Sequence, residues 1–207
     1  DAGQGSEALK QSAALLQATS QQQAKMAFDS LSGQSQTTAK DIALETSDAL
    51  QPLLTERLFD LARLQETSNG AWIMFANPNG RKHSSGFIPV DISSNLIAAG
   101  IDHQWDKLIL GAALFSADDN AQFDGVQDFL KSNRQGVSLY GRHQGEYGFV
   151  QGFAFLSKYS QRTSRTLTVG QVSSLANSRS DGSSQGISIE AGKEFNNHLT
   201  LALQASA

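Results

Sequence analysis

The chain has 207 residues, of which 39% are hydrophobic, a formal net charge of −4 and no cysteine. Its length allows one domain of ordinary size with a real core, its mild acidity argues against a nucleic-acid reader, and the lack of cysteine removes disulfides and structural zinc clusters. No run of 18 apolar residues and no charged-then-apolar leader occurs in this segment, so we expect neither a membrane-spanning helix nor a signal peptide in it.

The first 66 residues are expected to be helical. Apolar residues recur at three- or four-residue steps over 9–31 and again over 39–61, which is helical spacing. Gly33 between the two runs is a helix stop, and Pro52 predicts a kink or a restart because it cannot donate to the carbonyl of Asp48. The polar face of the first run is Gln and Ser rather than charged. That leaves two interpretations, an ordinary helical hairpin or a helix in an enclosed but wet environment.

After Asn69-Gly70 the periodicity changes to two residues, which predicts β-strands. A mean hydropathy of −0.31 is compatible with membrane-spanning strands, since these alternate in polarity. We expect seven strands, each about long enough to cross a bilayer when tilted. They are residues 71–76, 95–105, 107–117, 136–144, 146–157, 185–195 and 198–206. The sequence thus divides into a helical segment, 1–66, and a mainly β part, 67–207.

Short and long connections alternate between these strands. Very short turns are expected at Asp106, near Gly145-Glu146 and at Asn196-Asn197, and long polar connections at 77–94, 118–135 and 158–184. Outer-membrane barrels show this alternation, with tight turns on the periplasmic side and long loops outside. A weak repeat, with glycines eleven residues apart in successive hairpins, agrees with it. The pattern favours an antiparallel up-and-down transmembrane barrel, although an antiparallel soluble sheet also buries one face.

Residues 182–186, Gly-Ser-Ser-Gln-Gly, fit the G-x-S-x-G signature of serine hydrolases. A nucleophile elbow needs a helix directly after the serine. Ser184 is instead followed by strict alternation of apolar and polar residues, on which no helix can be written. We therefore assign no catalytic residue to this chain.

The same stretch predicts which side chains would face lipid. Ile187, Ile189, Ala191 and Phe195 would face hydrocarbon and Ser188, Glu190 and Glu194 a wet lumen, because a carboxylate in hydrocarbon is costly. Strands 107–117 and 147–156 are apolar on both faces, so their sides stay unassigned. Some aromatic residues near strand ends could join interfacial girdles. These are Trp72, Trp105, Tyr140, Tyr147 and Phe195.

Other constellations are weak. The four histidines show no spacing typical of metal ligands, and no glycine-rich phosphate loop follows a strand and opens a helix. We expect no metal and no cofactor. Arg142 and Glu190, on neighbouring hairpins, are candidates for charges on a pore wall.

Residues 27–58 resemble the segment that precedes the barrel in autotransporters, the type V secretion proteins of Gram-negative bacteria. The similar features are Leu31-Ser32-Gly33, the Ala/Leu/Asp-rich helix after it, and Arg57-Leu58 before Trp72. Residues 98–123 look like the second and third strands of that family, and 136–157, with Arg165 after them, like the fourth and fifth. The sequence departs from the family pattern at Gln34, where the family more often has an acidic residue, and at Gln36-Thr37, where the family often has His-Ala.

This resemblance implies a translocator in the cell outer membrane: a twelve-stranded barrel whose pore holds a helix leading to an exported N-terminal passenger. The passenger is often an adhesin, an esterase or a protease. Outer-membrane lipid, the passenger, the barrel-assembly machinery and periplasmic chaperones are the implied partners. Lumen-facing residues expected to touch the helix over 36–66 are Asp102, Arg142, Ser188 and Glu190.

Seven strands are fewer than a closed bacterial barrel needs, so we expect this chain to be a fragment that lacks the passenger and the closing strands. Three alternatives stay open. The first is a passive outer-membrane channel with a periplasmic helical appendage. The second is an enzyme that uses Ser184, and the third is a soluble all-β binding module with a helical arm.

Overall fold

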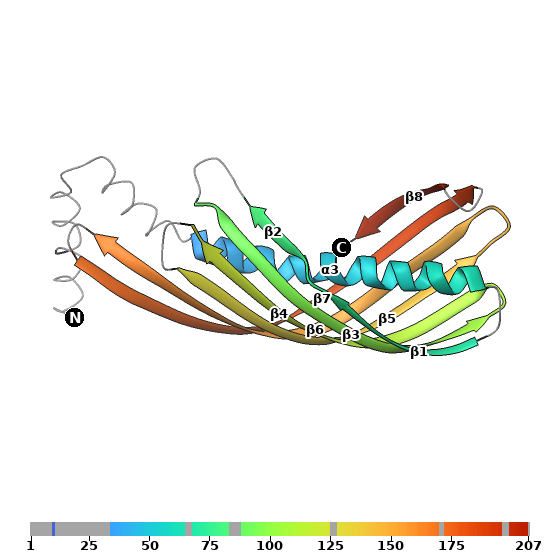
Figure 1. Ribbon diagram of the computed structural model, residues 1–207, viewed down its shortest axis with the longest axis horizontal. Helices are drawn as coiled ribbons and strands as arrows, with labels where there is room; N and C mark the ends of the chain where they lie inside the picture. Colours follow the sequence, from blue (N-terminus) through green and yellow to red (C-terminus); the bar gives the residue numbers. More distant parts are fainter. Residues whose placement is uncertain are drawn as a thin grey trace.

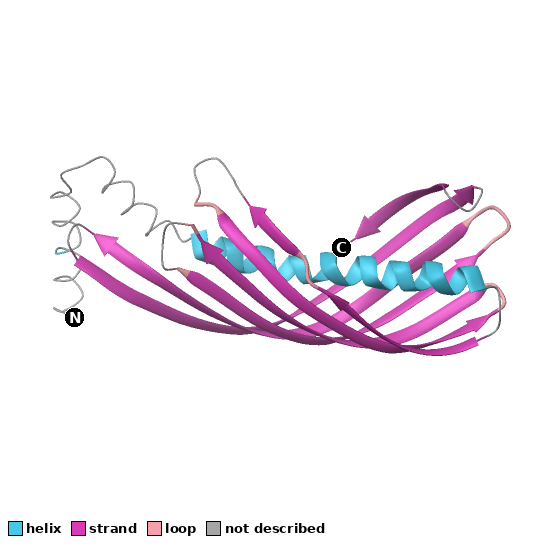
Figure 2. Cartoon of the chain, in the orientation of Figure 1, coloured by secondary structure: helices cyan, strands magenta, loops and turns pink. Residues whose placement is uncertain are grey.

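The computed structural model describes residues 10, 34–64, 68–82, 88–124, 128–169, 172–195 and 199–206. Helix α3 (Gln34–Leu64) precedes one antiparallel sheet. The strands are β1 (Ser68–Ala76), β2 (Asn79–Lys82), β3 (Val90–Trp105), β4 (Leu108–Phe123), β5 (Phe129–Gln144), β6 (Phe149–Val169), β7 (Val172–Phe195) and β8 (Leu199–Ser206). They pair in the order β1-β3-β4-β5-β6-β7-β8, and the helix lies along the concave side of the curved sheet (Figures 1 and 2). The expectation of a mainly β, antiparallel fold with a preceding helix is confirmed.

Strand β2 is an addition to the seven expected strands, and Pro78 explains it. Both β1 and β2 pair with β3 in one continuous register, since Ala76 lies opposite Leu96 and Asn79 opposite Ser93. Proline has no N–H to donate, so it interrupts a ladder on an edge strand. The carbonyl of Pro78 still accepts a bond of 3.0 Å from the amide of Ser94.

The prediction of long polar connections is wrong. Much of each polar stretch continues the adjoining strands, so that β6 and β7 run to 21 and 24 residues and meet across residues 170 and 171. This hairpin extends beyond the other strands, at the end of the sheet away from the tight turns (Figure 1). Hydropathy reports where a strand meets an apolar environment, whereas the ladder is made by backbone groups that any residue carries. The polar stretches therefore show no alternation of apolar residues in the sequence, although their backbones are hydrogen-bonded as strands.

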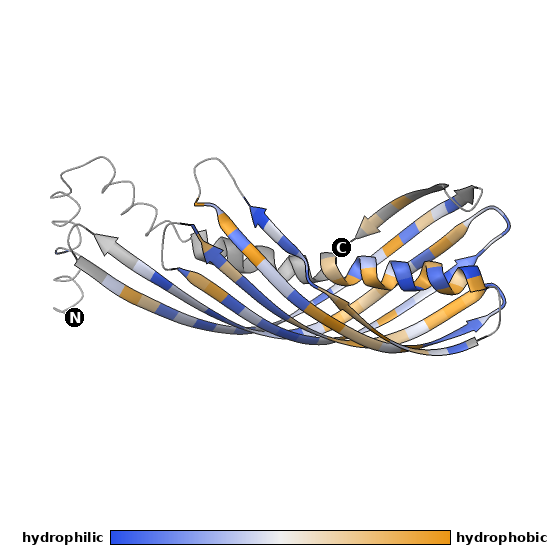
Figure 3. Ribbon diagram, viewed as in Figure 1, coloured by the Kyte–Doolittle hydropathy of each residue, from blue (hydrophilic) through white to orange (hydrophobic). Residues whose placement is uncertain are grey.

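The convex face of the sheet carries an apolar belt near the tight-turn ends of the strands. We define the belt by its exposed side chains, which are Ile73, Phe75, Ile97, Ile101, Leu110, Leu114, Val137, Leu139, Val150, Leu156, Ile187 and Ile189. Alternate positions turn inward, so Leu96 and Ala98 are 2% and 1% exposed on either side of Ile97. Farther along the strands the same face is mainly polar, with Phe129 and Leu175 as exposed exceptions, and the rise in polar residues along the strands can be followed in Figure 3.

Strands β4 and β6, whose sides the sequence left open, now have defined faces. In β4, Ile109 and Phe115 are buried while Leu110 and Leu114 are exposed. In β6, Phe149, Phe153 and Phe155 are buried while Val150 and Leu156 are exposed. Both faces are apolar because one contacts the helix and the other belongs to the belt.

Helix α3 packs an apolar stripe against the inner face of the sheet. The stripe is Leu50, Leu53, Leu54, Leu58 and Leu61, at the spacing of one helical face. These leucines contact inward apolar side chains of the sheet, so the helix lies on an apolar core, whereas the sequence predicts a wet lumen. Of the kink or restart expected at Pro52, the restart is wrong, because the described helix continues through this residue; Leu53 and Leu54, which follow it, are both buried.

No described helix is long and apolar enough to cross a lipid bilayer. The helical run expected over 9–31, apart from residue 10, lies outside the described residues, as does Gly33.

Four aromatic rings on the inner face lie over glycines of a neighbouring strand. The backbone-paired sets are Trp72 with Gly100, Phe115 with Gly136, Tyr140 with Gly111, and Tyr159 with Gly182. A Cβ atom added to Gly111 would lie 2.2 Å from Cζ of the Tyr140 ring. The missing side chain is therefore what lets this ring lie flat across the sheet.

Candidate functional site

The helix is joined to the sheet by a buried ion pair. Nε of Arg57, on α3, donates to Oδ2 of Asp102 at 2.8 Å, and Nη2 donates to Oδ1 at 3.1 Å. The Arg57 side chain is 21% exposed and that of Asp102 is 1% exposed. Two parallel bonds fix the orientation of both groups, so this contact sets how the helix sits against β3.

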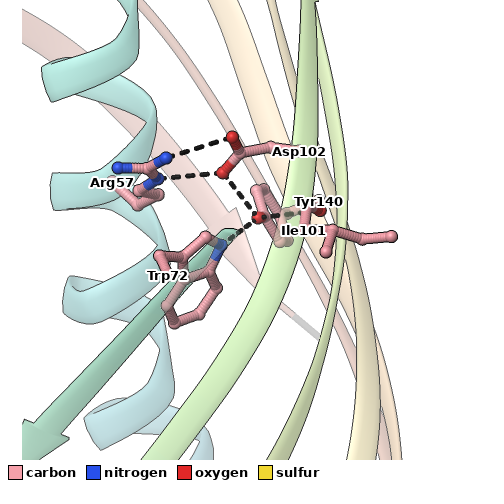
Figure 4. Close-up of polar contacts among 5 residues, drawn as sticks. All are labelled: Arg57, Trp72, Ile101, Asp102 and Tyr140. Carbon is pink, nitrogen blue, oxygen red and sulfur yellow. Dashed lines mark hydrogen bonds and ion pairs between the residues drawn. The ribbon is translucent and has the colours of Figure 1, made fainter. Parts of the chain in front are cut away.

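The carboxylate of Asp102 continues into a chain of hydrogen bonds across the sheet (Figure 4). The hydroxyl of Tyr140, on β5, donates to Oδ2 of Asp102 at 3.1 Å, and the indole Nε1 of Trp72, on β1, donates to the same hydroxyl at 2.7 Å. Gly70 leaves room for the ion pair, since a Cβ atom there would lie 2.5 Å from Oδ1 of Asp102 and 2.6 Å from Nη2 of Arg57. We call Arg57, Asp102, Tyr140 and Trp72 the anchor network.

A second set of contacts, centred on Arg142, joins the helix to β5, β6 and β7. The Arg142 guanidinium lies 4.5 Å from the ring centroid of Phe59, on α3, and 4.0 Å from that of Phe149. Its Nη1 donates to Oε1 of Gln151 at 3.0 Å, and Nε2 of Gln151 donates to Oε2 of Glu190 at 2.9 Å. Stacking on aromatic faces offsets part of the cost of burying this cation. Phe59 and Arg57 are two residues apart on the helix, so neighbouring positions reach both halves of the sheet.

The four residues singled out in the sequence thus fall into distinct places. Asp102 belongs to the anchor network, and Arg142 and Glu190 are linked through Gln151. Ser188 is 5% exposed on the inner face of β7, opposite Phe153. Asp102 and Arg142 are 6% and 2% exposed, and Glu190 is half-buried.

The sequence reasoning missed the anchor partners on the helix and on β1 and β5. The sequence makes Trp72 and Tyr140 candidates for an interfacial girdle, but Tyr140 is 3% exposed and Trp72 packs against the core, so both belong to the inner face. The alternation of side chains along β1 indicates this placement: Ile73 and Phe75 face outward, so Trp72, at the alternate position, faces inward. Trp105, by contrast, is half exposed on the outer face. The side chains of Phe195 and Glu194 lie outside the described residues.

Ser184 lies in the middle of β7, and its hydroxyl pairs with that of Ser157 at 2.7 Å. A nucleophile elbow places the serine between a strand and a helix, and β7 continues to Phe195 instead. This serine therefore lacks the backbone setting of the hydrolase motif.

Comparisons with known proteins give a matching family and similar solved structures. A family model described as the autotransporter beta-domain matches residues 71–207. Among solved structures, the translocator domain of the autotransporter NalP from Neisseria meningitidis is 16% identical, with 72% of this chain and 51% of that chain covered and a TM-score of 0.48. The beta domain of the Bordetella autotransporter BrkA is 19% identical, with 67% and 56% covered and a TM-score of 0.48.

This chain therefore spans about half the length of those two structures. No curated protein sequence matches it. Since the family match extends over well more than half of its residues, the chain belongs to the autotransporter beta-domain family.

Proposed function

We propose that the chain is part of a translocator that resides in the cell outer membrane and exports or displays an N-terminal passenger. The seating of α3 on the inner face, through the anchor network, carries this proposal. The helix begins toward the end of the sheet from which β6 and β7 extend, and it finishes near the tight turns (Figure 1). In barrels of this class the tight turns lie on the periplasmic side. A passenger attached ahead of the helix would therefore lie at the opposite, outer end of the sheet.

The mechanism we propose is geometric and uses no chemistry of the chain itself. The apolar belt would contact hydrocarbon while paired strands satisfy the backbone groups within it. Residues 67–207 would form the barrel part, and residues 1–66 the linker and pore helix. Asp102, Arg142, Ser188 and Glu190 would be lumen-facing residues that hold the helix or the strands around it. Lipid, the passenger, the barrel-assembly machinery and periplasmic chaperones would be its partners.

The test is export of a reporter. An epitope-tagged reporter placed ahead of residue 1 in the complete protein should become accessible to protease on intact Gram-negative cells. Retention of a folded reporter in the periplasm, with the barrel inserted, would refute export. Conductance without export, unchanged by deletion of residues 1–66, would favour a passive channel.

A further inference from the structure

The outer face of β5 and β6 carries a group of cations beyond the apolar belt. Lys131 and Arg162 lie directly opposite each other in the β5–β6 ladder, and both are exposed on the outer face. Lys158 lies on the same face of β6, closer to the belt. Like charges that face each other across two strands destabilise the pair, so this arrangement favours an external anion. We call Lys131, Lys158 and Arg162 the cation patch.

The nearest carboxylates are already engaged by other groups. Asp118, on β4, accepts a bond of 2.6 Å from the amide of Asn133. Asp181, on β7, accepts from the Ser160 hydroxyl and pairs with Arg179, whose Nε lies 3.5 Å from Oδ2, and the charge of Arg162 also acts on it. Arg179 lies directly opposite Arg162 in the β6–β7 ladder, so the cations on this part of the outer face outnumber these two carboxylates and the field is positive on balance.

The cation patch extends over a range of heights above the belt. Lys158 lies two residues beyond Leu156, and Lys131 six residues beyond Val137. Six residues of strand span about 20 Å, which is about 14 Å of height at a tilt of about 45°. Phospholipid head groups occupy only about 5–7 Å on each side of the hydrocarbon. A head group that meets all three cations must therefore be larger, as in a phosphorylated sugar lipid.

Two hollows lie on the outer face along these strands. The lower one is nearer to the apolar belt than Lys158, and the upper one is farther from it. The lower one, of about 570 Å³, is apolar and lies over the belt; its side chains include Val137, Leu139, Ala154, Leu156 and Ile187. It lies where Ala154 is flanked by the larger Leu139 and Ile187, with which it pairs across the ladder. An acyl chain fits a hollow of this kind.

The upper hollow, of about 450 Å³, is lined by polar groups. Lys131 and Arg162 border it together with the amides of Asn120 and Asn133 and the hydroxyl of Ser160. Asp118 and Asp119 also line it; Asn133 donates to the carboxylate of the first and Ser94 to that of the second. Cations beside amide and hydroxyl donors make a surface complementary to phosphate oxygens.

We propose that this face of β5 and β6 binds a phosphorylated glycolipid of the outer membrane leaflet, with an acyl chain in the lower hollow and phosphates on the cation patch. The inference rests on the outer-membrane location given in the proposed function. Long lysine and arginine side chains can bend toward the head groups, which brings the charges of Lys131 and Arg162 nearer to phosphates of the sugar core. The ligand class follows from the charge, the height and the apolar hollow together.

Binding of rough lipopolysaccharide to the complete barrel, folded in detergent, tests the proposal and is measured by titration calorimetry. The triple variant Lys131→Gln/Lys158→Gln/Arg162→Gln should bind at least tenfold more weakly, since one cation near an anionic membrane surface is worth about fivefold. A charge-matched control, Arg63→Gln/Lys107→Gln/Lys193→Gln, lies away from the cation patch and should bind as the unsubstituted chain does. Circular dichroism in the same detergent verifies that both variants are folded.

Dephosphorylated lipopolysaccharide should bind the unsubstituted chain as weakly as the phosphorylated lipid binds the triple variant, and phosphatidylglycerol should not compete. Equal affinity of the triple variant and the unsubstituted chain would overturn the proposal. So would phosphate-independent binding, or equal competition by phosphatidylglycerol, which would make the face a general anionic-lipid surface. The measurement needs no passenger, so a failure of lipid binding is distinguishable from a failure of export.

Discussion

The anchor network predicts an asymmetric response to the removal of either partner of its ion pair. The Asp102 side chain is 1% exposed and the Arg57 side chain 21% exposed. Arg57→Leu leaves a buried carboxylate whose remaining bond within the network is the one from Tyr140, whereas Asp102→Leu leaves a guanidinium that water reaches. Breaking a buried pair at one side costs about 3–5 kcal/mol. We expect about 3 kcal/mol for Arg57→Leu and, because a partly hydrated cation costs less, about 1.5 kcal/mol for Asp102→Leu.

The double variant distinguishes the cost of an unpaired buried charge from the cost of lost packing. Arg57→Leu/Asp102→Leu removes both charges and adds apolar volume beside the leucine stripe of α3. Replacing both members of a buried pair by apolar residues is often close to neutral. The double variant should therefore be more stable than Arg57→Leu alone, which corresponds to a coupling energy of about 2 kcal/mol or more.

Urea unfolding of the chain in detergent micelles measures these differences. Trp72 donates to Tyr140 within the network, so its emission, in a Trp105→Phe background, reports on this part of the sheet. Each variant is compared through its unfolding midpoint, with the slope checked for a change in the exposed area. The reasoning would be refuted by an Asp102→Leu variant as unstable as Arg57→Leu, or by a double variant whose loss equals the sum of the two.

Two further substitutions probe the inner face. Gly111→Ala should lower the free energy of unfolding by about 1–3 kcal/mol in the same urea assay, because its Cβ atom would lie 2.2 Å from the Tyr140 ring. The control Gly80→Ala has nothing within 4 Å of its Cβ position and should be neutral or slightly stabilising. Equal losses in the two variants would contradict the close-approach argument. Glu190→Leu should lower the yield of assembled barrel in membranes, because Gln151 loses its acceptor, whereas Glu146→Leu in the exposed β5–β6 turn should not; unchanged assembly of the first variant would remove Glu190 from the inner-face contacts.

The fold was predictable where side chains report on their environment directly. Alternation around Ile187 and Ile189 predicted a strand with two unlike faces, and both isoleucines are about half exposed on the outer face. The helix over 39–61 was predictable from its leucine spacing for the same reason. Both signals arise because one side of an element meets a different medium from the other.

The polar strand extensions were not predictable in this way. The segment from Lys158 to Ser184 has few apolar residues, yet most of it pairs in the β6–β7 ladder. Backbone hydrogen bonds leave no trace in the hydropathy of the side chains. Similarly, Pro78 divides one edge ladder into two strands without changing its register, so the strand count depended on a single residue.

The inner-face contacts were predictable only in part. A buried carboxylate such as Asp102 could be assigned to the inner face by parity, but its partner Arg57 is 45 residues away in the sequence. Pairing at that distance depends on how deeply the helix enters the concave face and on its rotation. Neither quantity is encoded in a local pattern, so the anchor network emerged from the structure.

The rings that lie over glycines also act on strand alignment during assembly. A slip of two residues between β4 and β5 would preserve every inward and outward position, so hydrophobicity alone could not reject it. It would, however, bring Tyr140 against Ile109 or Ala113 instead of Gly111, and the ring would collide with a side chain. Shape thus discriminates between alignments that polarity treats as equal, because only the correct ladder places each ring beside a glycine that leaves room for it.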